Sequence, residues 1–207
     1  MTSLPSRPVA TWLCAAVLAT LTAGCAAPLL LGGAAFGGAA MVASDRRTAA
    51  TQIEDQSIEF KANNRVRDAL GDKQHVSATS YNRLVLLTGE VHTDADRTAV
   101  EQTVAKVENV KNVVNELVVG WPSSMSARSS DLVLAGKVKA TFIDAKALPA
   151  NAFKVVVERS VVYLLGRVTE AEATRAVDLT RTISGVQKVV RLLDVVTEAE
   201  LQETKPK

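Results

Sequence analysis

Two histidines, His75 and His92, are the residues of this 207-residue chain best suited to bind a metal or to act as a general base. Neither has another histidine, a cysteine or a carboxylate at a spacing typical of metal ligands, and a zinc site needs three or four converging ligands. The chain also contains no G-x-S-x-G, H-E-x-x-H or P-loop pattern. We therefore expect no cofactor, no metal site and no enzymatic activity, and we interpret His92 as a residue of a surface turn.

Other residues of chemically useful type fit structural roles. Glu170 and Glu172 lie at the start of a predicted helix, where carboxylates complement the helix dipole. A catalytic carboxylate pair would need a pocket that shifts its pKa values. Gly89 and Gly166 lie near the ends of apolar strands, so we interpret them as points of close backbone packing. An exported enzyme stays as an alternative that would require a polar pocket.

The N-terminal region is apolar, and residues 9–43 contain no Asp, Glu, Lys or Arg. Its VATWLCAAVLATL run is typical of a secretory signal peptide. An uncleaved membrane anchor is the alternative, which Pro28 and the glycines after it disfavour. Of the two cysteines, Cys14 would be removed with the signal and Cys25 would be retained. An unpaired thiol in an exported protein calls for an explanation.

The LTAGC stretch at residues 21–25 resembles the bacterial lipobox. The resemblance implies a signal peptide at residues 1–24 and a lipid attached to Cys25, and several acyl chains on one residue hold a protein at a membrane. A chance match in an apolar run is the alternative. Ala26, in place of Asp, implies sorting to the outer membrane, with the body on the periplasmic face. We expect residues 25–52 to be the lipidated N-terminus and a tether, although the GGAAFGG part could instead lie in the membrane interface or pack on a neighbour.

The rest of the chain contains an internal repeat, which is the strongest indication of its fold. LVLLTGEV at residues 84–91 matches VVYLLGRV 77 residues later, and VENVKNVVNELVV at residues 107–119 matches ISGVQKVVRLLDVV at residues 183–196. In both copies, hydrophobic periodicity predicts the order helix, strand, strand, helix, strand. The predicted elements are residues 54–71, 75–81, 84–91, 93–108 and 111–119 in the first copy, and 129–148, 153–160, 161–168, 170–184 and 187–196 in the second.

This pattern predicts an α+β fold with two tandem small α/β sandwiches, each a three-stranded sheet with two helices on one face. The element order, the G-x-V turn after the second strand and the V-x-x-V-x-N-x-L ending resemble the BON domain. The tandem arrangement behind a lipobox resembles outer-membrane lipoproteins with two BON domains. The expected bounds are residues 53–121 for the first domain, 122–129 for a Pro/Ser linker, 130–197 for the second domain and 198–207 for a C-terminal tail.

Charge distinguishes the two copies. Residues 53–121 have eight Lys or Arg against eleven Asp or Glu, whereas residues 128–197 have eleven against seven. A basic domain held near a membrane suits anionic lipid headgroups. Nucleic acid is a poor candidate because aromatic residues that could stack on bases make up 4% of the chain.

The first helix of the second copy concentrates the candidate binding residues. If Leu134, Val138 and Phe142 face the core, two apolar residues lie off that stripe among three lysines, an arrangement typical of an interfacial helix. The alternative is that the two apolar residues widen the core face. The resemblance implies that this helix binds phosphatidylglycerol and cardiolipin, although related proteins have an aromatic residue where Val133 stands. The candidate lipid-binding residues are Val133, Lys137, Lys139, Ile143 and Lys146.

These observations predict a lipid-anchored, non-enzymatic protein that binds anionic phospholipid membranes through its second domain. The first domain would contact proteins or the second domain. The resemblance implies a role in outer-membrane integrity and at division sites. The alternative is an adaptor that binds envelope proteins, such as the outer-membrane assembly machinery or regulators of cell-wall amidases, with incidental lipid contact.

Overall fold

The structure, a computed structural model, describes residues 45–71, 74–145 and 148–203. The expected signal peptide, Cys25 and Lys146 lie outside these ranges. Residues 44–207 form one compact unit. The described part of the first copy contains α3 (Ala49–Leu70), β1 (His75–Tyr81), β2 (Leu84–Val91), α4 (Asp94–Ala105), β3 (Asn112–Asn115) and β4 (Val118–Val119).

The second copy has the same order of helices and strands, with a short 3-10 turn before its first strand and a short helix after its last. Its elements are α5 (Met125–Asp144), η1 (Ala150–Ala152), β5 (Phe153–Glu158), β6 (Val161–Val168), α6 (Glu170–Arg181), β7 (Lys188–Val195) and α7 (Glu198–Glu203). In each sheet the central strand pairs antiparallel with the strand before it and parallel with the strand after α4 or α6. The sheet orders are β1-β2-β3, with β4 also paired to β2, and β5-β6-β7. The predicted fold class is confirmed, except that the first sheet has four strands rather than three, because the expected last strand is divided into β3 and β4.

Three helices extend into segments that were expected to be a tether, a linker or a tail. Helix α3 begins at Ala49, inside the expected tether, because the side chain of Thr48 accepts a hydrogen bond from the Thr51 backbone and caps the helix. Helix α5 begins at Met125, inside the expected linker, and Ser124 caps it in the same way. The expected tail contains α7. A segment rich in Ser and Pro can therefore hold a helix start, because serine is a favourable N-cap residue.

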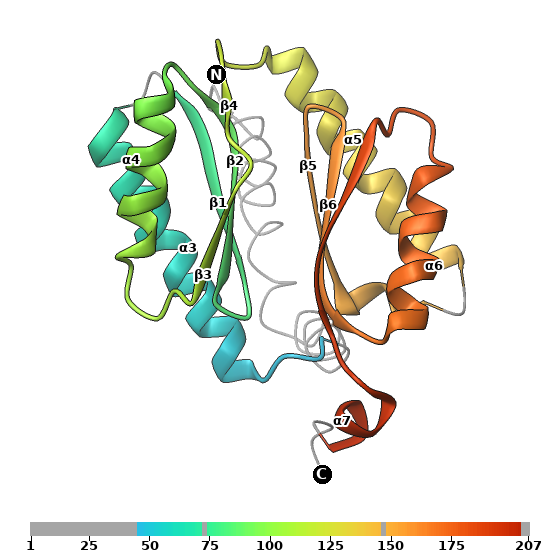
Figure 1. Cartoon of the computed structure of the whole chain (residues 1–207). Helices are drawn as coiled ribbons and strands as arrows, with labels where there is room; N and C mark the ends of the chain where they lie inside the picture. The colour runs from blue at the N-terminus through green and yellow to red at the C-terminus, as the bar shows by residue number, and fades with distance from the viewer. Residues whose placement is uncertain (1–44, 72–73, 146–147, 204–207) are drawn as a thin grey trace, which may run out of the picture. The chain divides into compact units, whose positions relative to one another are not determined.

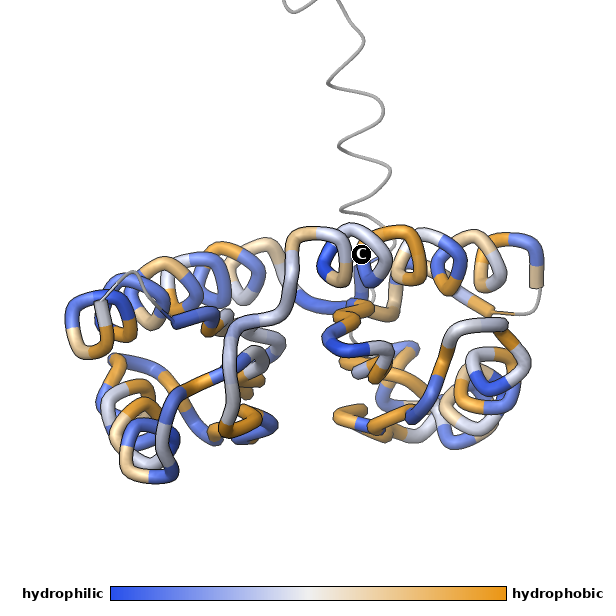
Figure 2. The backbone as a smooth tube through the Cα atoms, turned by 90° about the horizontal axis from the view of Figure 1, so that it is seen from above, coloured by the Kyte–Doolittle hydropathy of each residue, from blue (hydrophilic) through white to orange (hydrophobic). Residues whose placement is uncertain are grey.

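Each domain has its own hydrophobic core between its helices and one face of its sheet. In the first domain, Ile58 and Ala62 of α3 and Val100 of α4 pack against β2. In the second domain, Val138 and Phe142 of α5 pack on β6 in the corresponding way. Helices α3 and α4 cover one sheet and α5 and α6 cover the other (Figure 1). Hydrophobic and hydrophilic residues both occur along the helices (Figure 2).

A third core joins the two sheets by their other faces. Tyr81 and Leu86 of the first domain pack with Tyr163 and Leu165 of the second, and all four side chains are buried. Strands β2 and β6 are therefore covered on both faces, which explains why their sequences are nearly continuous apolar runs. All three cores lie within residues 44–207, so this compact unit has the packing it needs to fold without the preceding residues.

The two hairpins have strained turns that a buried carboxylate supports. Asn82 and Arg83, which connect β1 and β2, both have positive φ angles, and the carboxylate of Asp55 accepts hydrogen bonds from both backbone N–H groups. In the second copy, Asp131 accepts the corresponding bonds from Arg159 and Ser160, which also have positive φ angles. Positive φ angles at non-glycine residues cost conformational energy. The carboxylates therefore hold the turns in shape and tie each hairpin to its helix.

The two strand glycines are points of close packing, as predicted. Gly89 has a φ angle of 113°, and a Cβ atom built there would lie 1.9 Å from the carbonyl oxygen of His75. At Gly166 a Cβ atom would lie 2.4 Å from the carbonyl oxygen of Ala152. No side chain fits at either distance, so glycine at these positions lets the neighbouring strand approach.

Candidate functional site

The outward face of α5 carries an apolar stripe. Leu134, Val138 and Phe142 face the core, whereas Val133 and Ile143 are 60% and 68% exposed. The alternative that Val133 and Ile143 widen the core face is therefore wrong. Two further residues of this helix are exposed and were missed by the sequence analysis: Met125, 74% exposed, and Leu132, 75% exposed.

The spacing of these residues could have indicated the stripe. Met125, Leu132 and Ile143 are separated by seven and eleven residues, which is close to two and three turns of an α-helix, so they lie on one side. Leu132 also lies off the core stripe of Leu134, Val138 and Phe142, so the same spacing identifies it. Met125 was overlooked because its segment was interpreted as a linker.

Basic side chains flank this stripe. Lys137 and Lys139 are both exposed, and neither forms an ion pair with a residue in the described ranges. Their ammonium groups are therefore free to meet an anionic partner. Lys146, the third candidate lysine, lies outside those ranges.

A shallow groove of about 430 Å³ lies beside the N-terminal half of α5. It is bordered by Lys137, by the carboxylate of Asp131, by apolar atoms of Val133 and by several hydroxyl groups. The hydroxyls of Ser129 and Ser130 donate to carbonyl groups within α5, so the Lys137 ammonium is the group at the groove that suits a phosphate. The serines at the groove are Ser126, Ser129, Ser130, Ser160 and Ser184.

The first domain exposes a different set of apolar residues. Ile53 and Phe60 of α3 are 68% and 70% exposed. Trp121, just after β4, is also exposed and packs its ring edge-on against His92 at a centroid distance of 5.5 Å. His92 is exposed, as predicted for a surface turn.

Polar contacts also join the two domains around the third core. The hydroxyl of Tyr81 accepts a hydrogen bond from the backbone N–H of Arg167 at 3.1 Å. The guanidinium of Arg46, which precedes α3, donates two hydrogen bonds of 2.7 and 2.8 Å to the carboxylate of Glu172 at the start of α6. This Arg46 contact and the buried third core fix the faces by which the domains meet. Of the two contacts expected for the first domain, with proteins or with the second domain, the contact with the second domain is present.

Glu172 has two roles at the start of α6. It forms a capping box with Thr169, and Glu170 beside it pairs with Arg191, so both carboxylates lie at the helix start as predicted. The hydrogen bonds from Arg46 outweigh the effect of burial and lower the pKa of Glu172 below its usual value.

We expect Arg46→Ala to lower the free energy of unfolding by about 1–2 kcal/mol, because it removes a bidentate, partly buried ion pair. The depressed pKa of Glu172 means that this contribution is present above the carboxyl's unfolded-state pKa and is lost as the pH falls through its folded-state value. Urea unfolding at neutral and acidic pH measures both effects. Arg175→Ala is the control, because Arg175 is an exposed arginine of α6, the helix that contains Glu172. This change should have little effect on the free energy of unfolding. An equal loss in both variants would contradict the assignment.

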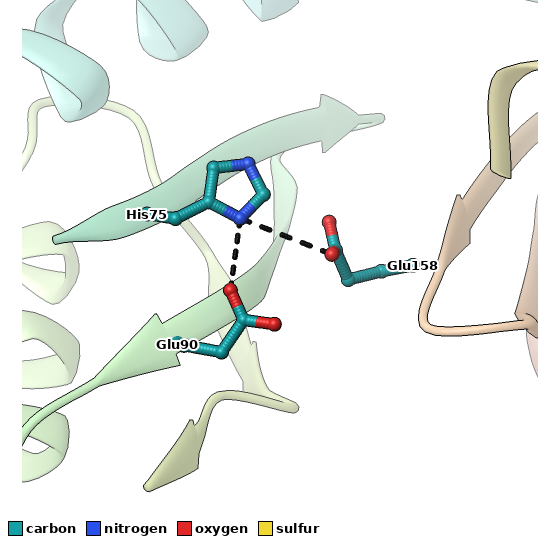
Figure 3. Close-up of side chains that lie close together, drawn as sticks. All are labelled: His75, Glu90 and Glu158. Carbon is teal, nitrogen blue, oxygen red and sulfur yellow. Dashed lines mark hydrogen bonds and ion pairs between the residues drawn. The ribbon is translucent and has the colours of Figure 1, made fainter. Parts of the chain in front are cut away.

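The surroundings of His75 differ from those expected from the sequence, because two carboxylates lie close to its ring. The register of the first hairpin places it directly opposite Glu90, and its Nδ1 atom lies 3.0 Å from Glu90 Oε2. Glu158 of the second domain approaches the same nitrogen atom to 3.9 Å (Figure 3). The expectation that no carboxylate accompanies this histidine is therefore wrong. The sequence does not reveal the cluster because its members come from three strands and two domains.

No helix among the described residues is long and apolar enough to cross a membrane. The BON domain model matches residues 54–120 and again residues 130–197. The chain therefore belongs to the BON domain family and carries two copies of the domain.

Two curated proteins resemble the chain over most of its length. The outer membrane lipoprotein DolP of Haemophilus influenzae is 40% identical over 172 residues, which cover 82% of this chain and 87% of that protein. The 21 kDa hemolysin of Actinobacillus pleuropneumoniae is 29% identical over 154 residues, which cover 73% of this chain and 79% of that protein. These similarities confirm the predicted class, an outer membrane lipoprotein with tandem BON domains.

A solved structure of CdsD, a structural protein of the type III secretion system of Chlamydia trachomatis, is more distantly similar. It is 12% identical, with a TM-score of 0.30, and the match covers 73% of this chain and 96% of that one. A likeness this remote supports no argument about fold or function.

Proposed function

We propose that this protein is a non-enzymatic outer-membrane lipoprotein that binds anionic phospholipids, such as phosphatidylglycerol and cardiolipin, through α5 of its second domain. The observation that carries the proposal is the outward stripe of Met125, Leu132, Val133 and Ile143, which is exposed and flanked by Lys137 and Lys139. An exposed apolar stripe edged by lysines is typical of helices that lie in a membrane interface. The apolar side chains would enter the acyl boundary while the lysines meet headgroup phosphates.

The groove beside α5 supports the choice of lipid. Its exposed lysine favours a lipid with net negative charge over a zwitterionic one. Each lysine near an anionic surface contributes about 1 kcal/mol to binding. A lipid on Cys25 at the periplasmic face of the outer membrane would add to this by keeping the domain at a high effective concentration near the bilayer. Mass measurement of the mature N-terminus tests the lipid on Cys25.

Vesicle flotation tests the assignment of α5. The residues 44–207 unit is mixed with vesicles of phosphatidylglycerol or of phosphatidylcholine and floated through a density gradient. We expect binding to the anionic vesicles alone, weaker at high salt because screening reduces attraction to the lysines. Lys137→Glu combined with Ile143→Asp should reduce that binding at least tenfold.

A matched control makes the same chemical changes in the first domain. Lys111→Glu combined with Ile53→Asp alters one exposed lysine and one exposed isoleucine there. This control should float like the unchanged protein. Unchanged binding by the α5 variant, or equal loss in the control, would rule out α5 as the lipid-binding element.

The alternative function is a periplasmic adaptor for envelope proteins, among them the outer-membrane assembly machinery or amidase regulators. The exposed pair Ile53 and Phe60 on α3 favours it, because these apolar side chains have no role in the core of the first domain. In this case the residues 44–207 unit would bind neither kind of vesicle. A role in membrane integrity and at division sites is compatible with both proposals.

A further inference from the structure

Three side chains that commonly bind metals converge where the two domains meet. His75 lies at the start of β1, Glu90 near the end of β2 and Glu158 at the end of β5. One ligand atom from each residue lies within 4.8 Å of the other two. All three side chains point toward a common centre, two from the first domain and one from the second (Figure 3).

We propose that His75, Glu90 and Glu158 form a binding site for a divalent transition-metal ion, with zinc as the best fit. Zinc bonds to histidine nitrogen and carboxylate oxygen at about 2.0–2.2 Å with tetrahedral angles, which separates neighbouring ligand atoms by about 3.4 Å. The two distances from His75 Nδ1, 3.0 Å to Glu90 and 3.9 Å to Glu158, bracket that value. Small side-chain movements would therefore complete three protein ligands, leaving a fourth position for water.

An unsatisfied carboxylate oxygen is the second observation that points to a cation. Oε1 of Glu158, the oxygen directed at His75, is buried and accepts no hydrogen bond from the described residues. Glu90, which faces it, is fully buried. The Arg159 guanidinium pairs with Glu90, so the charge of Glu158 is the one without a partner when the His75 ring is neutral, and a metal ion bound between the two carboxylates would supply positive charge at that place.

The surroundings of Glu90 resemble the outer shell of a metal site. Its Oε1 atom accepts a hydrogen bond from the Arg159 guanidinium at 3.1 Å, which leaves Oε2 directed at His75. Hydrogen bonds of this kind orient a metal-binding carboxylate. Arg159 itself is held in a positive-φ turn by Asp131, so the orientation depends on the strained hairpin.

The ligand set selects among metals. Magnesium and calcium prefer six or more oxygen ligands, whereas an imidazole with two carboxylates suits zinc and its neighbours in the transition series. Metal binding at Nδ1 would require the neutral tautomer with its proton on Nε2, and coordination would replace the contact between Nδ1 and Glu90. A metal ion bound here would link β1 and β2 of the first domain to β5 of the second.

Equilibrium dialysis of the residues 44–207 unit against zinc chloride tests the site. This unit contains no cysteine and has two histidines, so few competing ligands are present. We expect one zinc ion per chain, and at least tenfold weaker binding in His75→Ala and in Glu158→Gln. His92→Ala removes the other histidine, which is exposed, and is the matched control that should bind like the unchanged unit.

Two further measurements distinguish loss of zinc binding from loss of folding in the Glu158→Gln variant. Glu158→Gln replaces a carboxyl whose inward oxygen has no hydrogen bond, so circular dichroism should be unchanged. Zinc should raise the thermal unfolding midpoint of the unchanged unit and leave that of Glu158→Gln within about 1 °C of its metal-free value. Absence of zinc binding by the unchanged unit, or equal binding by Glu158→Gln and the His92→Ala control, would overturn the proposal and leave an ion pair only.

Discussion

Replacing Asp55 by alanine is expected to lower the free energy of unfolding by about 3–5 kcal/mol at neutral pH, because it removes a buried charge partner and orphans several donors. The Asp55 side chain is 2% exposed and pairs with Arg47 at 2.7 Å. Its carboxylate also accepts hydrogen bonds from the Ser80 hydroxyl and from the backbone N–H groups of Asn82 and Arg83. Loss of these bonds releases the β1–β2 turn, whose two residues have positive φ angles.

The effect of Asp55→Ala should depend on pH. Burial opposes ionisation of this carboxyl, but the hydrogen bonds from Arg83, Ser80, Arg47 and Asn82 outweigh it and lower its pKa. The ionised group therefore stabilises the fold above its unfolded-state pKa of about 3.9, and this stabilisation is lost as the pH falls through the lower folded-state value. Chemical unfolding of both proteins across this range should show their difference shrinking in acid.

Asp94→Ala is the matched control for Asp55→Ala. Asp94 is also an aspartate of a helix in the first domain, but its side chain is 85% exposed. We expect a loss of less than about 1 kcal/mol from this change. A loss at Asp55 no larger than at Asp94 would mean that the turn keeps its shape without the carboxylate.

The role of the two aspartates could have been predicted from the sequence. Asp55 lies three residues before Ile58 and Asp131 lies three residues before Leu134, so in both copies an acidic residue occupies the apolar stripe of the helix. A charge at a core position, repeated in both copies, indicates a buried polar contact. The predicted strands at residues 75–81 and 84–91 leave Asn82 and Arg83 as their connection, whereas the carboxylate that supports this turn was not predicted.

The helices and strands followed from the sequence because their periodicity and turns are local properties. The packing of one sheet on the other is not a local property, although the LVLL and VVYLL runs give an indirect indication of it. A sheet with one face in water would alternate polar and apolar residues, so an uninterrupted apolar run indicates burial on both faces. The His75 cluster could not be predicted, because Glu158 reaches His75 only after the two sheets have packed together.

The outward residues of α5 could be predicted only in part, because their spacing is a local property and their exposure is not. The core stripe of α5 fixes which residues face outward, so Val133 and Ile143 could be proposed from spacing alone. Whether these two side chains are buried or exposed depends on how the helix packs on its sheet, and the structure shows that they are exposed. Met125 could have been proposed only if Ser124 had been recognised as the N-cap of α5.

Placing a charge between the sheets should uncouple the two domains. Leu86 is fully buried in the third core, so Leu86→Asp puts an unpaired carboxylate among apolar side chains and is expected to cost more than about 4 kcal/mol. Each domain keeps its separate core between helices and sheet. We therefore expect one cooperative thermal transition in the unchanged residues 44–207 unit and two separate transitions in the variant, measured by calorimetry.

Two comparisons make the result of Leu86→Asp specific. Val195→Asp introduces the same charge on β7 at a side chain that is 45% exposed, and should leave a single transition with a nearly unchanged midpoint. Leu86→Ala leaves a cavity without a charge and should cost about 2–4 kcal/mol. A single transition in Leu86→Asp, at the midpoint of the unchanged unit, would mean that the third core does not couple the domains. Uncoupling together with intact vesicle binding would instead locate lipid recognition in the second domain alone, because α5 does not contribute to the third core.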